Sequence, residues 1–135
     1  LDELRQCEFL PFEAGIEAGS EFVMAGHISV PEAAGEDTPA SLSEKVISGI
    51  LRDELGYDGI VVTDAMNMGA VTEHYSSAES AVMAVQAGAD VILMPSDLQS
   101  AYQGILDAVQ EGKITEDRLD ESVRRILELK TEKDI

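Results

Sequence analysis

The segment Gly56–Gly69, with the sequence GYDGIVVTDAMNMG, decides the fold of this chain. Its central residues, Ile60–Thr63, are apolar or β-branched, and such a run is typical of a short strand buried on both faces. The run ends at a carboxylate, Asp64, which a turn of small residues follows. The carboxyl end of a buried parallel strand is where α/β proteins place their chemistry. Asp64 is therefore either a functional carboxylate or only the cap of the next segment.

Two further apolar runs flank this segment, Phe22–Ala25 upstream and Val91–Pro95 downstream. In all three cases a helical pattern leads through a glycine and an acidic residue into the strand, which makes a weak internal repeat. Helices that alternate with short buried strands predict parallel pairing. A closed barrel needs eight strands and typically about 250 residues. We therefore expect an α/β fold that is a partial (β/α)8 TIM barrel: about three β/α units with parallel strands and a C-terminal helix.

Side chains that cap helices mark four helix starts. Ser41–Glu44 and Ser76–Glu79 fit capping boxes, and Asp97 and Thr115 fit single N-caps. The segment 28–40 carries Pro and Gly and predicts a long loop, which in compact domains is usually functional or disordered.

The composition excludes several partners. The chain has 135 residues, of which 9 are basic and 27 acidic, for a net charge of −18. This balance argues against binding to nucleic acid or to an anionic membrane surface. No apolar run is long enough to span a bilayer.

The lone Cys7 cannot form an internal disulfide. The compartment stays open, because the sequence does not begin with Met and any targeting signal would lie upstream of Leu1.

Seven segments in this order and spacing resemble a known family over essentially the whole chain. They are Leu10–Phe12, Val23–His27, Pro39–Ser43, Leu51–Gly59, Val62–Met68, Ala87–Asp90 and Met94–Pro95. The chain resembles the C-terminal part of the catalytic barrel of glycoside hydrolase family 3, in particular its bacterial β-N-acetylglucosaminidases (β-hexosaminidases). The resemblance implies that residues 1–135 are the C-terminal segment of such a barrel domain and not a complete domain.

The resemblance also implies roles for three residues. Asp64 matches the family's nucleophile, which in a retaining glycosidase forms a covalent glycosyl-enzyme. His27, at the end of the first strand, is predicted to bind the substrate; the alternative is a histidine bonded to loop backbone. Met68 is predicted to line the sugar's acyl group, although a Met at this spacing also fits a core. The implied enzyme removes terminal β-linked N-acetylglucosamine, so its partner is a carbohydrate, and it needs no cofactor.

Two upstream motifs of the family do not occur in this sequence: a Lys-His pair before a Gly-rich stretch, and an Asp-x-His loop that supplies the general acid/base. We therefore expect the intact parent to be a glycosidase and the isolated chain to be inactive. Its strands, apolar on both faces, are expected to pair with the missing half-barrel or with a second copy. His74 and His27 have no third ligand in sight, so no metal site is predicted.

The sequence leaves one alternative function open and argues against another. A β-glucosidase of the same family stays open, because half of the sugar pocket is absent and the sugar and linkage cannot be read. A phosphoacceptor receiver domain is disfavoured. It requires two acidic residues after an early strand and a Lys after a late one, whereas these strands end at Gly26-His27 and at Met94-Pro95-Ser96.

Overall fold

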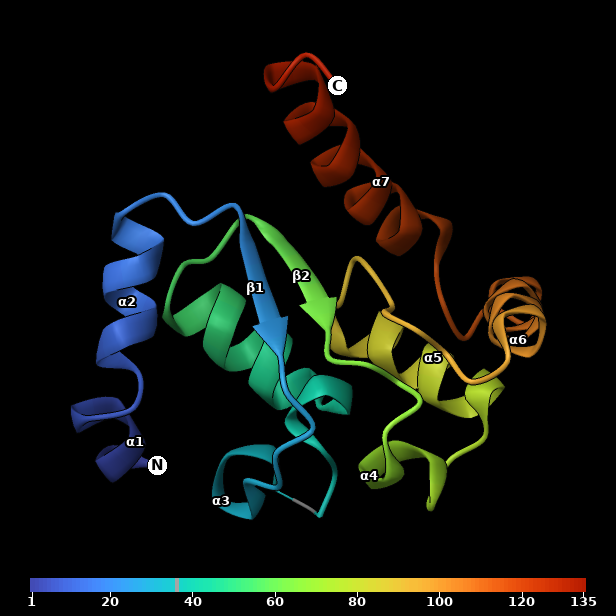
Figure 1. Ribbon diagram of the computed structural model, residues 1–135, viewed down its shortest axis with the longest axis horizontal. Helices are drawn as coiled ribbons and strands as arrows, with labels where there is room; N and C mark the ends of the chain where they lie inside the picture. The colour runs from blue at the N-terminus through green and yellow to red at the C-terminus, as the bar shows by residue number, and fades with distance from the viewer. Residues whose placement is uncertain (36) are drawn as a thin grey trace.

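The computed structural model describes residues 1–35 and 37–135 of the chain. At its centre lie two parallel strands, β1 (Phe22–Ala25) and β2 (Ile60–Thr63), which pair in register along their whole lengths (Figure 1). Both strands occupy the residues that the sequence predicted, and their parallel pairing confirms the expected α/β class.

The third strand, predicted at Val91–Pro95, is not formed in full, and the prediction of three complete strands is wrong. Only Val91 pairs with β2, through a single parallel bridge. The backbone N–H of Leu93 bonds at 3.0 Å to the side-chain hydroxyl of Thr63 instead of a strand carbonyl. Met94 then takes a positive φ of 48°, a left-handed conformation that ends an extended strand. Within the described residues, the sheet therefore has two strands and one bridge.

Helices make up most of the remaining described chain. They are α1 (Asp2–Gln6), α2 (Leu10–Glu17), α3 (Pro31–Ala34), η1 (Ala40–Leu42), η2 (Lys45–Glu54), α4 (Gly69–Thr72), α5 (Ser77–Ala87), α6 (Leu98–Gln110) and α7 (Glu116–Glu132). The expected C-terminal helix is α7, and α3 lies inside the segment predicted as a long loop. Helix η2 is wound with i→i+5 hydrogen bonds. Among the described residues, no helix combines the length and the apolar character needed to cross a membrane.

Three of the four predicted helix starts are confirmed. Ser76 and Glu79 form the reciprocal capping box at the start of α5. The side chains of Asp97 and Thr115 accept backbone N–H groups at the starts of α6 and α7. These caps satisfy donors that the first helical turn leaves unpaired.

The capping box predicted at Ser41–Glu44 is not formed. Helix η2 begins without a side-chain cap, and Ser41 belongs to the short helix η1. The Ser41 hydroxyl lies 2.6 Å from a ring nitrogen of His27. The Ser41 hydroxyl is thus bonded to His27, which the tertiary fold brings close, and not to the backbone of the nearby Glu44.

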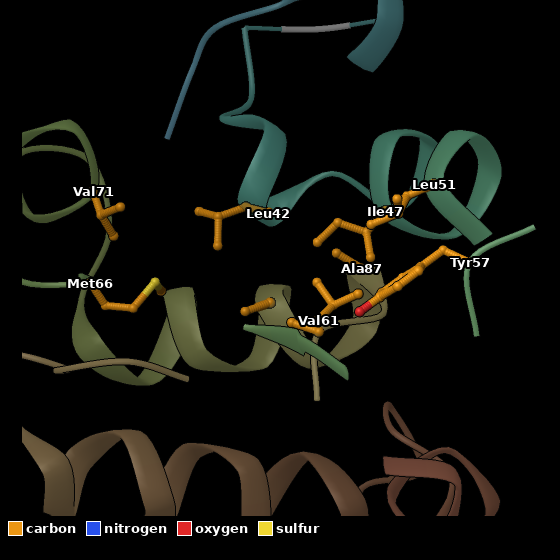
Figure 2. Packing of buried hydrophobic residues seen from close by; sticks show 10 residues of the cluster. Leu42, Ile47, Leu51, Tyr57, Val61, Met66, Val71 and Ala87 are labelled. Atoms are coloured by element: carbon orange, nitrogen blue, oxygen red, sulfur yellow. The ribbon is translucent and has the colours of Figure 1, made fainter. Parts of the chain in front are cut away.

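The main core lies between β2 and the helices η2 and α5 (Figure 2). Val61 of β2 is fully buried against Ile47 and Leu51 of η2 and Ala87 of α5. Tyr57 belongs to the same cluster. Burial raises the pKa of Tyr57 to about 12, because apolar surroundings disfavour the charged phenolate.

The other face of the strands is partly open. Phe22 and Met24 of β1 share the side of the sheet on which their ladder partners Ile60 and Val62 lie. Their exposed fractions are 52% and 55%. In Figure 1, η2 lies behind the strands and α5 lies beside β2, and residues of both helices pack with Val61. The part of this face that β1 carries is thus open, whereas Ile60 of β2 on the same side is only 3% exposed.

Helix α6 packs closely on α5 at Gly104. A Cβ atom added to Gly104 would lie 2.8 Å from the Cβ atom of Ala78. We expect Gly104→Ala to lower the free energy of unfolding by about 1 to 3 kcal/mol, because the added methyl group forces the helices apart. Gly15, inside α2, has nothing within 4 Å of an added Cβ atom. Gly15→Ala is the matched control and should raise the stability by about 0.5 to 1 kcal/mol. Urea unfolding measures both, and equal effects would contradict the close packing.

Candidate functional site

Asp64 lies where β2 ends. Its backbone N–H donates to the Ala25 carbonyl at 2.9 Å, so the ladder with β1 fixes its position. Its carboxylate Oδ1 accepts a hydrogen bond from the backbone N–H of Ala65 at 2.7 Å. The residue is half-buried. A carboxylate held through one oxygen on a rigid strand end can act as a nucleophile or a base through the other.

The turn after Asp64 is fixed by Met66. Its side chain is 2% exposed, and its N–H donates to the Leu93 carbonyl at 2.9 Å. Met68 is the N-cap residue of α4 and is 45% exposed. Met66 therefore occupies the core, and Met68 is accessible to a ligand.

His27 follows β1 and reaches the turn after Asp64. Its Nε2 lies 3.0 Å from the Ala65 carbonyl oxygen, and its Nδ1 lies 2.6 Å from the Ser41 hydroxyl. The imidazole is half-buried between these groups. His27 and the Asp64 turn thus meet at one edge of the sheet, as expected from parallel strands, but both ring nitrogens have protein partners.

Sequence reasoning missed Ser41 and Ala65 as part of this site. Ser41 is fully buried, and its backbone N–H donates to the Gly26 carbonyl at 3.2 Å. A serine three residues before a glutamate signals a helix cap, and nothing in that pattern points to a distant histidine.

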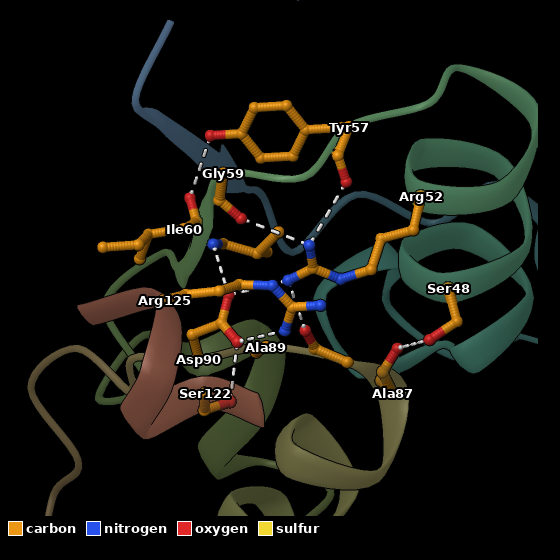
Figure 3. A network of polar contacts seen from close by, with 12 residues as sticks. Ser48, Arg52, Tyr57, Gly59, Ile60, Ala87, Ala89, Asp90, Ser122 and Arg125 are labelled. Carbon is orange, nitrogen blue, oxygen red and sulfur yellow. Dashed lines mark hydrogen bonds and ion pairs between the residues drawn. The ribbon is translucent and has the colours of Figure 1, made fainter. Parts of the chain in front are cut away.

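A buried ionic cluster lies at the N-terminal ends of the strands, opposite the ends that carry His27 and Asp64 (Figure 3). The fully buried carboxylate of Asp90 accepts hydrogen bonds from Arg52 at 2.7 Å and from the Val61 N–H at 2.9 Å through Oδ2. Its Oδ1 accepts from Ser122 at 2.6 Å and from Arg125 at 3.1 Å. The cluster joins η2, β2 and α7, which makes it a structural element.

Arg118 of α7 extends this cluster. It donates to the backbone carbonyls of Val85 at 3.1 Å and Ala89 at 2.8 Å. Burial lowers the pKa of the Arg118 guanidinium, and the nearby Asp90 carboxylate opposes this shift. The internal repeat marked the position of Asp90 in the sequence, but it carried no signal for arginines on other helices.

The part of the chain that the structure describes brings no three His, Cys, Asp or Glu side chains together in a group that could hold a metal ion. His74 lies edge-on to Tyr75, with ring centroids 6.3 Å apart.

Residues 1–129 match the family model described as "Glycosyl hydrolase family 3 N terminal domain". Beta-hexosaminidase A of Pseudoalteromonas piscicida is 31% identical over 96% of this chain and 25% of that protein. A protein of Cellulomonas fimi named beta-N-acetylglucosaminidase/beta-glucosidase is 32% identical over 88% of this chain and 23% of its own length. The chain thus spans about a quarter of the length of these relatives.

A solved structure is also similar. The glycoside hydrolase family 3 beta-N-acetylglucosaminidase from Paenibacillus sp. str. FPU-7 superposes with a TM-score of 0.92 at 44% identity. The superposition covers 96% of this chain and 25% of that one. The two strands and their helices therefore match part of a barrel domain of that family.

Proposed function

Because the chain belongs to glycosyl hydrolase family 3, we propose that it is a segment of the barrel domain of a retaining, exo-acting β-N-acetylglucosaminidase. Residues 1–135 form the C-terminal segment of that barrel, and its further strands lie elsewhere in the protein. Similarity to proteins named β-hexosaminidase and β-N-acetylglucosaminidase supports the choice of sugar. Membership of the family also removes the receiver-domain alternative.

The position of Asp64 carries this proposal. Its carboxylate lies at a strand end with Oδ1 oriented by the Ala65 N–H. In the proposed reaction its second oxygen attacks the anomeric carbon while a general acid protonates the departing glycosidic oxygen. Water, deprotonated by the same acid/base group, then attacks that carbon and releases the sugar from Asp64 with its configuration retained. The general acid belongs to a motif that this sequence does not contain.

Met68 is the second residue of the proposed sugar site. Met68, exposed beside the Asp64 turn, lines the acyl group of the sugar. Direct contact between His27 and the sugar stays a prediction, because Ser41 and Ala65 engage its ring nitrogens. A β-glucosidase activity is the second candidate, favoured by the double name of the Cellulomonas relative. Comparing kcat/KM for an aryl N-acetyl-β-glucosaminide and an aryl β-glucoside on the full-length protein separates the two.

Covalent trapping tests the mechanism. The full-length protein is incubated with a fluorinated aminosugar fluoride. This reagent forms the glycosyl-enzyme readily, and the glycosyl-enzyme is then hydrolysed only slowly. Mass spectrometry of the digested protein should find the sugar on the peptide that contains Asp64. Sugar attached to a different carboxylate would overturn the assignment of Asp64.

The isolated chain is expected to form dimers and to hydrolyse no glycoside. Phe22 and Met24 are half-exposed on an apolar face, and no strand lies on the free edge of β1 among the described residues. In the whole barrel the further strands cover this face. In the isolated chain a second copy covers it, because exposed apolar faces and open edges promote association.

Light scattering on the isolated chain measures this association. The double variant Phe22→Ser, Met24→Ser should shift the mass toward the monomer. Leu98→Ser is the control, because Leu98 is 73% exposed but lies on α6. A well-folded monomeric wild-type chain would mean that the open face of the strands needs no cover.

A further inference from the structure

We propose that His27 is a positioning residue that orients Asp64 through the Ala65 peptide and does not bind the sugar. The inference rests on the proposed function of Asp64 as nucleophile. Its basis is a series of hydrogen bonds that runs from a buried hydroxyl to the reacting carboxylate.

The two bonds of His27 define its tautomer. The Ala65 carbonyl oxygen, 3.0 Å from Nε2, can only accept, so Nε2 carries the proton. In the neutral ring Nδ1 then accepts the hydroxyl proton of Ser41 at 2.6 Å. Ser41 is fully buried and reaches no solvent or ligand. The imidazole is thus held from both sides by groups of the protein.

The bond to Ala65 acts on the nucleophile because Ala65 holds it. The Ala65 carbonyl accepts from His27, while the N–H of the same residue donates to Asp64 Oδ1 at 2.7 Å. A rotation of the backbone at Ala65 would move that N–H away from the carboxylate. The Ser41–His27 pair therefore limits the rotation that would misdirect Asp64.

Direct sugar contact fits this arrangement poorly. With both ring nitrogens engaged, His27 has no free donor or acceptor for a sugar hydroxyl unless one protein bond breaks. A positioning role needs no such exchange. Orientation also has large kinetic effects, since a misplacement of about 1 Å can cost about 100-fold in rate.

Kinetics of the full-length protein on an aryl N-acetyl-β-glucosaminide separate the two roles. Loss of a positioning residue lowers kcat and leaves KM nearly unchanged, whereas loss of a sugar contact raises KM or changes both. For His27→Ala we expect kcat to fall by about 10- to 100-fold. Ser41→Ala should lower kcat in the same direction by a smaller factor, although Ser41 cannot reach the sugar. His27→Gln should recover part of the loss, because its amide can donate to the Ala65 carbonyl.

A raised KM for His27→Ala together with wild-type kinetics for Ser41→Ala would overturn the positioning role. Lowered melting temperatures with unchanged kcat in both variants would also overturn it, because the histidine would then only stabilise the fold.

Crystal structures of the full-length wild-type and His27→Ala proteins provide a test that does not depend on activity. In the variant, the Ala65 peptide should rotate and the Asp64 carboxylate should lose its bond to the Ala65 N–H. An unmoved Asp64 carboxylate would overturn the inference. If these atoms move as expected while trapping labels another carboxylate, the coupling of His27 to Asp64 stands and only the nucleophile has been misassigned.

Discussion

Replacing Asp64 with alanine in the full-length protein is expected to lower kcat/KM for an aryl N-acetyl-β-glucosaminide by about four orders of magnitude. The substitution removes the atom that forms the covalent intermediate, so the double-displacement route is closed. The fold should survive, because Asp64 is half-buried and its ladder bond to Ala25 uses the backbone N–H. Thermal unfolding of the variant checks this second expectation.

Azide provides the positive test of the same variant. In Asp64→Ala the vacated space admits a small anion, which attacks the anomeric carbon as the glycosidic C–O bond breaks and the aryloxide departs. The product should be the glycosyl azide of inverted configuration, identified by NMR. Asp58→Ala is the control, since Asp58 is exposed on the turn before β2 and should leave the kinetics unchanged. Near-wild-type hydrolysis by Asp64→Ala would refute its role as nucleophile.

The largest effect on stability is expected for Asp90→Ala. The carboxylate of Asp90 is fully buried, and its partners Arg52 and Arg125 are only 12% and 20% exposed. Removing it leaves these guanidinium groups and the Val61 N–H without their buried acceptor. Breaking a buried ion pair on one side costs about 3 to 5 kcal/mol, so the free energy of unfolding should fall by that amount.

Urea unfolding of the wild type and of Asp90→Ala measures the difference. Asp58→Ala, which removes an exposed carboxylate, should change the free energy of unfolding by less than about 0.5 kcal/mol. Asp90→Asn adds a finer comparison, because it keeps an acceptor for the Val61 N–H while removing the charge. If Asp90→Ala and Asp58→Ala unfold alike, the cluster contributes nothing to stability.

Much of the fold was predictable because its signals are local. Runs of β-branched residues placed β1 and β2, and capping side chains placed the starts of α5, α6 and α7. These signals act within a few residues and do not depend on the rest of the chain. The prediction of a complete third strand was wrong because the backbone N–H of Leu93 donates to the side-chain hydroxyl of Thr63, 30 residues away, and not to a strand carbonyl. An apolar run in the sequence does not reveal that a distant side-chain hydroxyl will take the place of a strand carbonyl as acceptor.

The candidate site also has features that the sequence predicted and features that it did not. The order of residues along the chain placed Asp64 and His27 at the same edge of the sheet, because parallel strands end on one side. It did not reveal that His27 bonds to Ser41 and Ala65, which lie 14 and 38 residues away.

The sequence by itself thus determined the family, the two strands and the edge at which the nucleophile is proposed to act. Only the tertiary structure decided the partners of His27 and Ser41 and the arginines around Asp90. Each of these polar groups can bond to many others along the chain. Packing selects one, because a buried donor or acceptor must find a partner among the groups that the fold brings within reach.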